Sequence, residues 1–86
     1  MDVDIKNQLI SRTAKVLMFL GKNKDSNIVQ ISRGLEIDYN FVSKIIRRCE
    51  EIKLLTVGTD NRQKIIQLTA IGKKLSGLLV KIEKML

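Results

Sequence analysis

The sequence predicts a winged helix-turn-helix fold, mainly α with one small β-hairpin, followed by a C-terminal coiled-coil helix for dimerisation. Three patterns indicate this fold. Two helical segments meet at a tight turn before Asp38, as in a helix-turn-helix. Two β-prone runs around a polar tip follow in residues 54–68, where a wing is expected. The last segment, residues 70–85, spaces its apolar residues as a coiled coil does.

The first two helices are predicted from apolar residues that recur every three or four positions. Residues 5–21 show this spacing, and Gly21 is a suitable helix end. A polar turn separates this segment from a shorter helix over residues 27–33, which Gly34 is expected to break.

Residues 39–52 are predicted to form the second helix of the helix-turn-helix, with Asp38 as its N-cap. One face has the i, i+3, i+4, i+7 spacing of a core-facing stripe and consists of Val42, Ile45, Ile46, Cys49 and Ile52. The other face repeats this spacing with the polar residues Asn40, Ser43, Lys44 and Arg47. Side chains on one helix face project together, so these four are expected to form one surface.

The hairpin of residues 54–68 is expected to turn near Arg62, and Thr69 is expected to cap the last helix. The apolar residues of that helix, residues 70–85, follow intervals of 4, 3, 4 and 3, which is a coiled-coil seam. A second register widens the apolar stripe beyond what one intramolecular contact requires. We therefore expect a homodimer whose interface contains Ile71, Leu75, Leu78, Leu79, Ile82 and Met85.

The composition is that of one folded domain over residues 1–86. Hydrophobic residues make up 44% of the chain, and a core of this size gains stability from a second copy. The longest apolar run, residues 16–20, is far shorter than the roughly 20 residues of a membrane span, so no membrane partner is expected. The N-terminus lacks the basic cluster of a secretory signal, which predicts a cytoplasmic protein.

Residues that commonly carry out catalysis are scarce. The chain has no histidine and one cysteine, so neither a zinc site of the usual kind nor a Ser-His or Cys-His pair can form. No glycine-rich phosphate loop is present. We expect no enzyme activity, no metal and no cofactor. Cys49 is expected to be a small buried hydrophobe, with a redox-sensitive thiol as the alternative.

The charge of the chain indicates a polyanionic partner. The net charge is +7 at pH 7, and a basic surface gains affinity for nucleic acid by releasing counterions from its phosphates. Aromatic residues make up only 3% of the chain, which argues against a stacking surface for single strands. Together with the predicted fold, this favours double-stranded DNA as the partner and association with the nucleoid.

Residues 26–74 resemble the DNA-binding core of the MarR-type winged-helix regulators and, more loosely, short dimeric winged-helix proteins of archaea and their viruses. Two motifs carry the resemblance: Asp60-x-Arg62 in the wing and Leu68-Thr69-x-x-Gly72-Lys73 before the last helix. The resemblance implies a transcription regulator. Lys53 stands where such proteins often have a helix-ending glycine. The chain is also shorter than a typical member, so control by a small-molecule effector is not implied.

The predicted fold assigns roles to individual residues. The second helix of a helix-turn-helix lies in the major groove, where Arg or Lys reads guanine and Asn reads adenine. Base contacts are therefore expected from Asn40, Ser43, Lys44 and Arg47. Contacts to the backbone or to the minor groove are expected from Tyr39, Ser32, Arg33, Arg62 and Lys64.

Three alternatives stay open at this point. Any amphipathic helix has a polar face that water can solvate, so the polar stripe alone does not establish DNA reading. A basic winged helix could also coat DNA as an architectural chromatin protein without base preference. Winged helices further serve as protein-interaction modules, for which an apolar recognition face would be expected.

Overall fold

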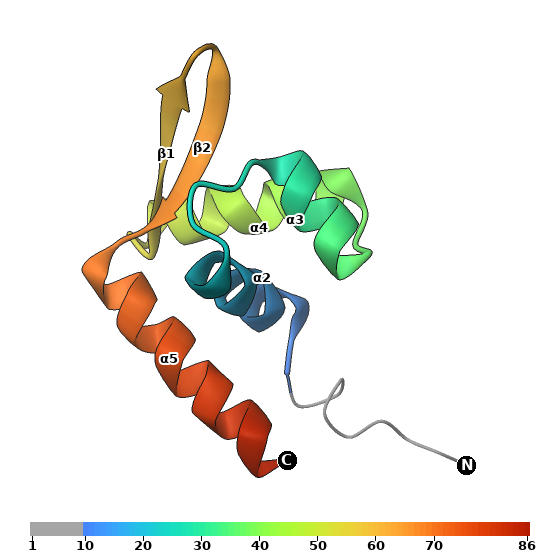
Figure 1. Cartoon of the computed structure of the whole chain (residues 1–86), viewed down its shortest axis with the longest axis vertical. Coiled ribbons are helices and arrows are strands. Elements are labelled where there is room, and N and C mark those ends of the chain that lie inside the picture. Colours follow the sequence, from blue (N-terminus) through green and yellow to red (C-terminus); the bar gives the residue numbers. More distant parts are fainter. Residues whose placement is uncertain (1–9) are drawn as a thin grey trace.

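The computed structural model describes residues 10–86, in which helices surround the base of one antiparallel hairpin (Figure 1). In chain order the elements are α2 (Arg12–Lys22), α3 (Ile28–Leu35), α4 (Tyr39–Glu51), β1 (Leu55–Asp60), β2 (Gln63–Leu68) and α5 (Ala70–Met85). This architecture confirms the predicted winged helix-turn-helix. Within the described residues, none of the helices has the length and apolar character that a membrane-spanning segment needs.

The first described helix, α2, begins later than the sequence predicted. Ser11 is its N-cap, because its Oγ accepts a hydrogen bond from the backbone N–H of Ala14 at 3.1 Å. Of the predicted helix over residues 5–21, residues 5–9 lie outside the described part of the chain. Ile10 and Ser11 are not helical. The predicted start is therefore wrong for these two residues, since the serine side chain caps the helix at this point.

Two glycines that were expected to end helices lie inside them instead. α2 continues past Gly21, where an added Cβ atom would collide with the Ser76 side chain of α5. α3 runs past the predicted end at residue 33 and contains Gly34, where a Cβ atom would collide with the ring of Phe19. Both glycines thus permit close packing between elements, which the local sequence does not reveal.

The second helix of the helix-turn-helix, α4, begins where the sequence predicted. The Asp38 carboxylate accepts hydrogen bonds from the backbone N–H groups of Asn40 at 3.0 Å and Phe41 at 3.4 Å. The predicted inward stripe is confirmed for Val42, Ile45, Ile46 and Cys49, which are all buried. Ile52 was predicted to share this stripe, but it is 66% exposed because the helix ends one residue earlier, at Glu51.

Both helices of the helix-turn-helix are followed by a residue in the left-handed conformation, Glu36 after α3 and Lys53 after α4. At the end of α4 the N–H of Leu54 donates to the Cys49 carbonyl at 2.9 Å, and the N–H of Lys53 donates to the Glu50 carbonyl at 3.0 Å. This pair of bonds is a Schellman motif. Lys53 therefore adopts the left-handed conformation that a glycine usually adopts at this position. The helix ends in the same way although the residue is a lysine.

The main core lies between α2, α3, α4 and the base of the hairpin. Each of these elements contributes side chains that are almost completely buried, and the largest are Val16, Ile31, Val42, Leu55 and Ile66. Full burial of one such side chain stabilises the fold by roughly 1.5–3 kcal/mol. The helix-turn-helix and the wing base thus share one core, which sets their relative orientation.

The last helix, α5, leaves this core and runs away from the wing along the long axis of the molecule (Figure 1). A second apolar cluster of Ile10, Ala14 and Met18 packs against Leu79 and Val80 of α5. The molecule measures 46 × 26 × 20 Å. The wing tip and the C-terminal end of α5 therefore lie at opposite ends of an elongated domain.

The end of α4, both ends of the hairpin and the start of α5 meet at one junction. The Thr69 Oγ1 donates to the Lys53 carbonyl at 2.7 Å and accepts a hydrogen bond from the N–H of Gly72 at 3.1 Å. The N–H of Thr69 donates to the Leu54 carbonyl at 3.0 Å. A Cβ atom on Gly72 would collide with this same carbonyl. The Leu68-Thr69-x-x-Gly72 motif therefore has a structural explanation, because it permits this contact.

Replacement of Gly72 by alanine is expected to lower the free energy of unfolding by about 1–3 kcal/mol, since the new methyl group meets backbone that cannot rotate away. Gly77 of the same helix is the matched control, because nothing lies within 4 Å of a Cβ atom there. Gly77→Ala should stabilise by up to about 1 kcal/mol through helix propensity. Urea denaturation measures both, and equal effects would contradict the proposed contact.

Candidate nucleic-acid interface

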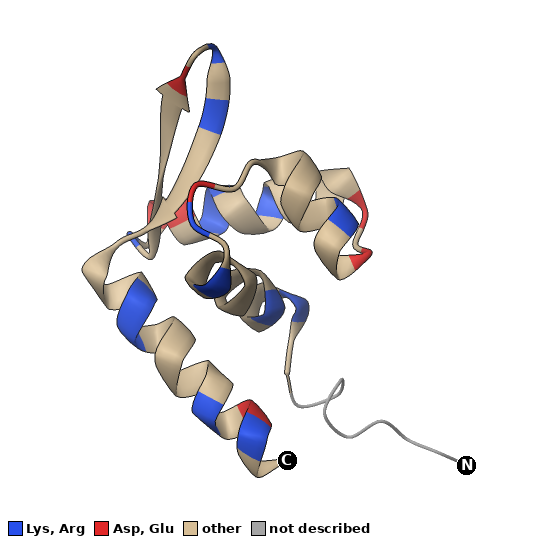
Figure 2. Ribbon diagram, in the orientation of Figure 1, with Lys and Arg blue, Asp and Glu red and all other residues tan. Residues whose placement is uncertain are grey.

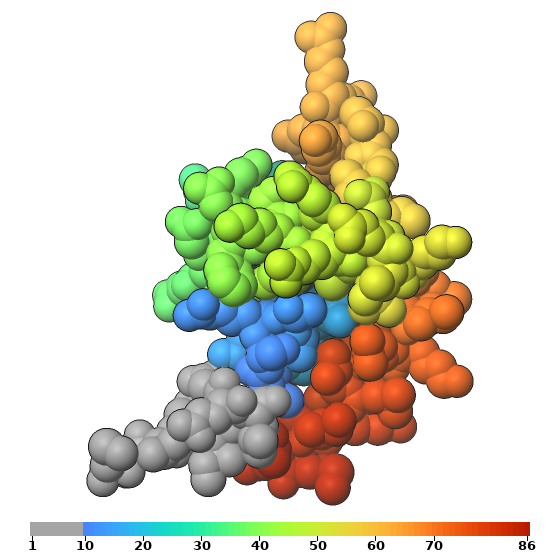
Figure 3. Space-filling model, turned by 180° about the vertical axis from the view of Figure 1, so that it is seen from behind, coloured from blue at the N-terminus to red at the C-terminus, as the bar shows by residue number. Residues whose placement is uncertain are grey.

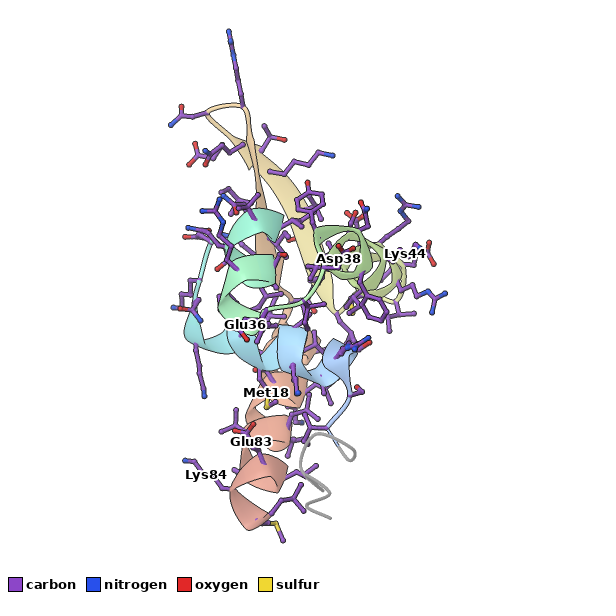
Figure 4. The ribbon with its side chains drawn as sticks, turned by 90° about the vertical axis from the view of Figure 1, so that its right-hand side faces the viewer. Met18, Glu36, Asp38, Lys44, Glu83 and Lys84 are labelled. Atoms are coloured by element: carbon purple, nitrogen blue, oxygen red, sulfur yellow. The ribbon has the colours of Figure 1, made fainter. Side chains whose placement is uncertain are left out.

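The exposed face of α4 carries the side chains that were predicted to read bases. Asn40, Lys44 and Arg47 are exposed, and Ser43 is half-buried at the edge of the same surface. Because the opposite face of α4 is buried in the core, this polar face must point away from the core. Figure 4 shows Lys44 projecting from α4 away from α2 and α5. The structure thus brings the predicted stripe together on one surface.

Charges along α4 are distributed unevenly. The cations Lys44, Arg47 and Arg48 lie between the middle of the helix and its last turn, whereas Glu50 and Glu51 lie at its C-terminal end (Figure 2). The first turn of α4 carries no cation and follows the carboxylate of its N-cap, Asp38. The side chains of α4 would therefore attract a polyanion mainly along the middle of the helix, between carboxylates at its two ends.

The residues predicted to contact the DNA backbone from the helix-turn-helix fall into two groups. Arg33 is exposed and Tyr39 is 49% exposed, so both side chains can reach a ligand. Ser32 is different, because its Oγ donates its one proton to the Ile37 carbonyl at 2.5 Å. A phosphate oxygen needs a donor. Ser32 therefore holds the turn between α3 and α4, and its predicted phosphate contact, which would have to compete with this hydrogen bond, stays a prediction.

The hairpin ends in a two-residue turn that presents Arg62. Asp60 pairs with Gln63 in the antiparallel register, and the residues between them, Asn61 and Arg62, both have positive φ, 47° and 67°. These angles are typical of the type I′ turn that suits a two-residue hairpin loop. Arg62 is exposed at the tip and Lys64 is exposed on β2, as the sequence predicted.

Four residues that the sequence analysis did not single out tie the wing to the loop between α2 and α3. Ser26 forms an isolated bridge with Ile66, whose N–H donates to the Ser26 carbonyl at 2.9 Å. The Gln67 amide donates to the Asp25 carboxylate at 2.5 Å. These bonds hold β2 against the helical core. No local pattern marks them, because each joins residues about 40 positions apart.

The single cysteine is a core residue. Cys49 is 1% exposed, and burial raises the pKa of its thiol above the ordinary value. Oxidation and metal binding proceed through the thiolate, so both the burial and the raised pKa oppose them. Within residues 10–86 no cluster of three or more His, Cys, Asp or Glu side chains is placed to hold a metal ion.

The six residues predicted to form a dimer interface divide into two sets in the protomer. Leu75 and Leu79 are half-buried against the core of their own chain, so they offer less surface to a second copy, and their place in the interface stays a prediction. The other four form an exposed stripe along the adjoining, outer face of α5: Ile71 at 67%, Leu78 at 48%, Ile82 at 46% and Met85 at 84%. We call these four residues the outer stripe of α5. Its apolar surface has no partner within the described residues of the chain.

Solved structures with the same fold are regulators of transcription. MepR, a transcription regulator of the Staphylococcus aureus multidrug efflux pump MepA, is 25% identical with a TM-score of 0.77 over 94% of this chain and 63% of its own. The MarR family transcriptional regulator SPO1453 from Silicibacter pomeroyi is 22% identical, with a TM-score of 0.76 over 85% of this chain and 53% of its own. The chain thus spans under two thirds of these neighbours.

A neighbour of similar length exists as well. The protein AF1382 from Archaeoglobus fulgidus is 25% identical, with a TM-score of 0.80 over 91% of this chain and 92% of its own. Neither a family model nor a curated protein matches the sequence. The resemblance to MarR-type winged-helix proteins is therefore confirmed by the fold.

Replacement of Arg62 by glycine is expected to raise the free energy of unfolding by about 1 kcal/mol, because a left-handed backbone costs roughly this much for a residue with a Cβ atom. Lys64→Gly is the matched control at an extended position of β2 and should destabilise the hairpin. Thermal unfolding of both variants measures the difference. A lower melting temperature for Arg62→Gly would contradict the assigned turn.

Proposed function

We propose that this protein binds double-stranded DNA as a homodimer and regulates transcription, with α4 in the major groove and the wing on the minor groove or backbone. One observation carries the proposal: Asn40, Lys44 and Arg47 are exposed together on the outer face of a recognition helix whose inner face is locked in the core. The adjacent wing presents a further exposed cation, Arg62. The similarity in fold to transcription regulators supports this function.

The chemistry of each side chain gives it a role in that complex. Arg47 can donate two hydrogen bonds to the O6 and N7 atoms of guanine, and Asn40 can bind the N6 and N7 atoms of adenine. Lys44 and Ser43 lie beside them and complete the surface that faces the bases. Ser43 is half-buried, so it can reach only a base edge that approaches closely.

We assign contacts outside the major groove to the other exposed residues for which the sequence predicted DNA contact. Arg33 and Tyr39 flank the turn of the helix-turn-helix and would contact phosphate or sugar. Arg62 would enter the minor groove, where the negative potential attracts guanidinium groups, and Lys64 would contact the backbone beside it. A protein with these contacts is expected on the nucleoid.

The outer stripe of α5 is proposed as the contact with a second copy of the chain. Parallel packing of two α5 helices would place both wings and both α4 helices at the same end of the dimer, because α5 points away from the wing (Figure 1). That arrangement is the one a single duplex requires. Two recognition helices in successive major grooves lie about 34 Å apart, so the bound site should be a pseudo-palindrome.

Selection of bound duplexes from a random pool tests the function most directly. A regulator should enrich two half-sites about one helical turn apart and prefer them by roughly 10³-fold or more over random DNA. An architectural protein would bind with steep salt dependence and enrich no sequence. No binding to any duplex at low salt would overturn the proposal and favour a protein-interaction module.

Arg47→Ala is expected to weaken binding to the selected site by about 1–3 kcal/mol and to relax the preference at one base position, since Arg47 is assigned to a base edge. Its affinity for random DNA should change much less. Arg47 is exposed, so the fold of the Arg47→Ala variant should be unaffected. Fluorescence anisotropy with matched specific and random duplexes measures both. An equal loss on the two duplexes would assign Arg47 to the backbone instead.

Leu78→Glu is expected to shift the protein from dimer to monomer, because it places a charge in the centre of the outer stripe of α5. Val29→Glu is the matched control, since Val29 is a comparably exposed apolar residue on α3, at 42%. Sedimentation velocity without DNA gives the mass of each variant. A monomeric unmodified protein, or a dimeric Leu78→Glu variant, would refute the proposed interface.

A further inference from the structure

A cation from the start of α2 lies against the recognition helix. The guanidinium carbon of Arg12, the first residue of α2, is 5.0 Å from the ring centroid of Phe41 in the first turn of α4. Both side chains are exposed, and Phe41 retains 41% of its accessible surface. A cation over the face of an aromatic ring is attracted by the negative potential of that face. The contact therefore holds the Arg12 side chain in place beside α4.

This contact leaves the hydrogen-bonding capacity of Arg12 available. A cation–π contact is an electrostatic attraction to the ring face and does not require hydrogen bonds from the five N–H donors of the guanidinium. Within residues 10–86, the described contacts of Arg12 include no carboxylate partner, so its charge is not neutralised there by an ion pair. An exposed, oriented guanidinium of this kind is suited to a phosphate oxygen.

Arg12 extends the cationic surface of α4 on one side. Phe41, Lys44 and Arg48 are spaced i, i+3 and i+7, so they share one side of the helix, and Lys44 also belongs to the predicted base-reading stripe. Arg12 adds its charge to this side from α2. In Figure 3 the start of α2, in blue, lies directly below α4, in yellow-green, while the wing rises above it on the same face.

The position of these cations fits the geometry of a major groove. A helix that lies in the groove has a sugar-phosphate backbone along each side. The wing lies on one side of α4 and the start of α2 lies on the other (Figure 3). Backbone contacts were predicted from the sequence on α3, the first turn of α4 and the wing, but not at the start of α2.

We propose that Arg12, held on the ring of Phe41, binds phosphate together with Arg48 on the DNA strand that borders α4 on the side opposite the wing. Arg12 and Arg48 are then phosphate-binding residues, and Phe41 is a positioning residue. This inference rests on the proposed function, because it assumes that α4 enters a major groove. The competing explanation is a purely structural contact that fastens the start of α2 to α4.

The salt dependence of DNA binding separates the two explanations. Each phosphate contact contributes about 0.9 to the slope of log affinity against log salt concentration. Arg12→Gln should therefore lower that slope by about 0.9 per protomer, equally on the selected duplex and on a random one. Arg12→Lys, which keeps the charge, should keep the slope. Lys84→Gln removes the same charge near the C-terminal end of α5 and is the matched control (Figure 4).

The positioning role of Phe41 has its own test. Phe41→Leu keeps an apolar side chain and all cations, so the slope should stay unchanged while affinity for both duplexes falls by about two- to five-fold, the size of one exposed cation–π contact. In the Arg12→Gln background the same substitution should have no further effect, because the cation that Phe41 positions is gone.

Three results would overturn the inference. If Arg12→Gln changes the slope no more than Lys84→Gln does while it lowers the melting temperature, the contact is only structural. If Phe41→Leu weakens binding equally in both backgrounds, Phe41 does not act through Arg12. If the unmodified protein binds no duplex at low salt, the proposed function fails and this inference fails with it. If Arg47→Ala weakens DNA binding but Arg12→Gln does not, the proposed function stands and only this inference is refuted.

Discussion

The arrangement of the whole molecule depends on the close approach of Gly72 to the backbone carbonyl of Leu54. β1 starts directly after Leu54, and α5 starts directly after Thr69, whose side chain is bonded to the Lys53 carbonyl. This one junction therefore joins the end of α4, both ends of the hairpin and the start of α5. The direction of α5 relative to α4 follows from this junction, and the junction also fixes the base of the wing that the core orients, because a side chain at residue 72 would force these segments apart.

The proposed functional surfaces are the faces that the core leaves free. α4 buries Val42, Ile45 and their neighbours and thereby presents its polar stripe outward. α5 packs one side against α2 and leaves an apolar outer stripe on the other. Because the wing tip and the end of α5 lie at opposite ends of the long axis, contact with a second copy and contact with DNA do not compete for the same surface (Figure 1).

Much of the fold could be predicted because it depends on neighbouring residues in the chain. The caps at Asp38 and Thr69 follow from side chains that can reach nearby backbone N–H groups. The polar stripe of α4 was predictable for the same reason, since helical periodicity alone places Asn40, Lys44 and Arg47 on one face. Contacts that no periodicity or capping pattern marks were not predictable in this way. One of them is the hydrogen bond from the Ser32 Oγ to the Ile37 carbonyl, which crosses the turn between α3 and α4.

The sequence by itself determined the order of the elements, most of their bounds and the polar and apolar faces of each helix. Only the tertiary structure decided how those faces are used. It placed Gly21 and Gly34 at close contacts instead of helix ends and divided the α5 residues between the core and the outer stripe. It also brought the guanidinium of Arg12 into contact with the ring of Phe41. The physical reason is that caps, turns and periodicity act over a few residues, whereas packing joins segments whose distance in the chain carries no local pattern.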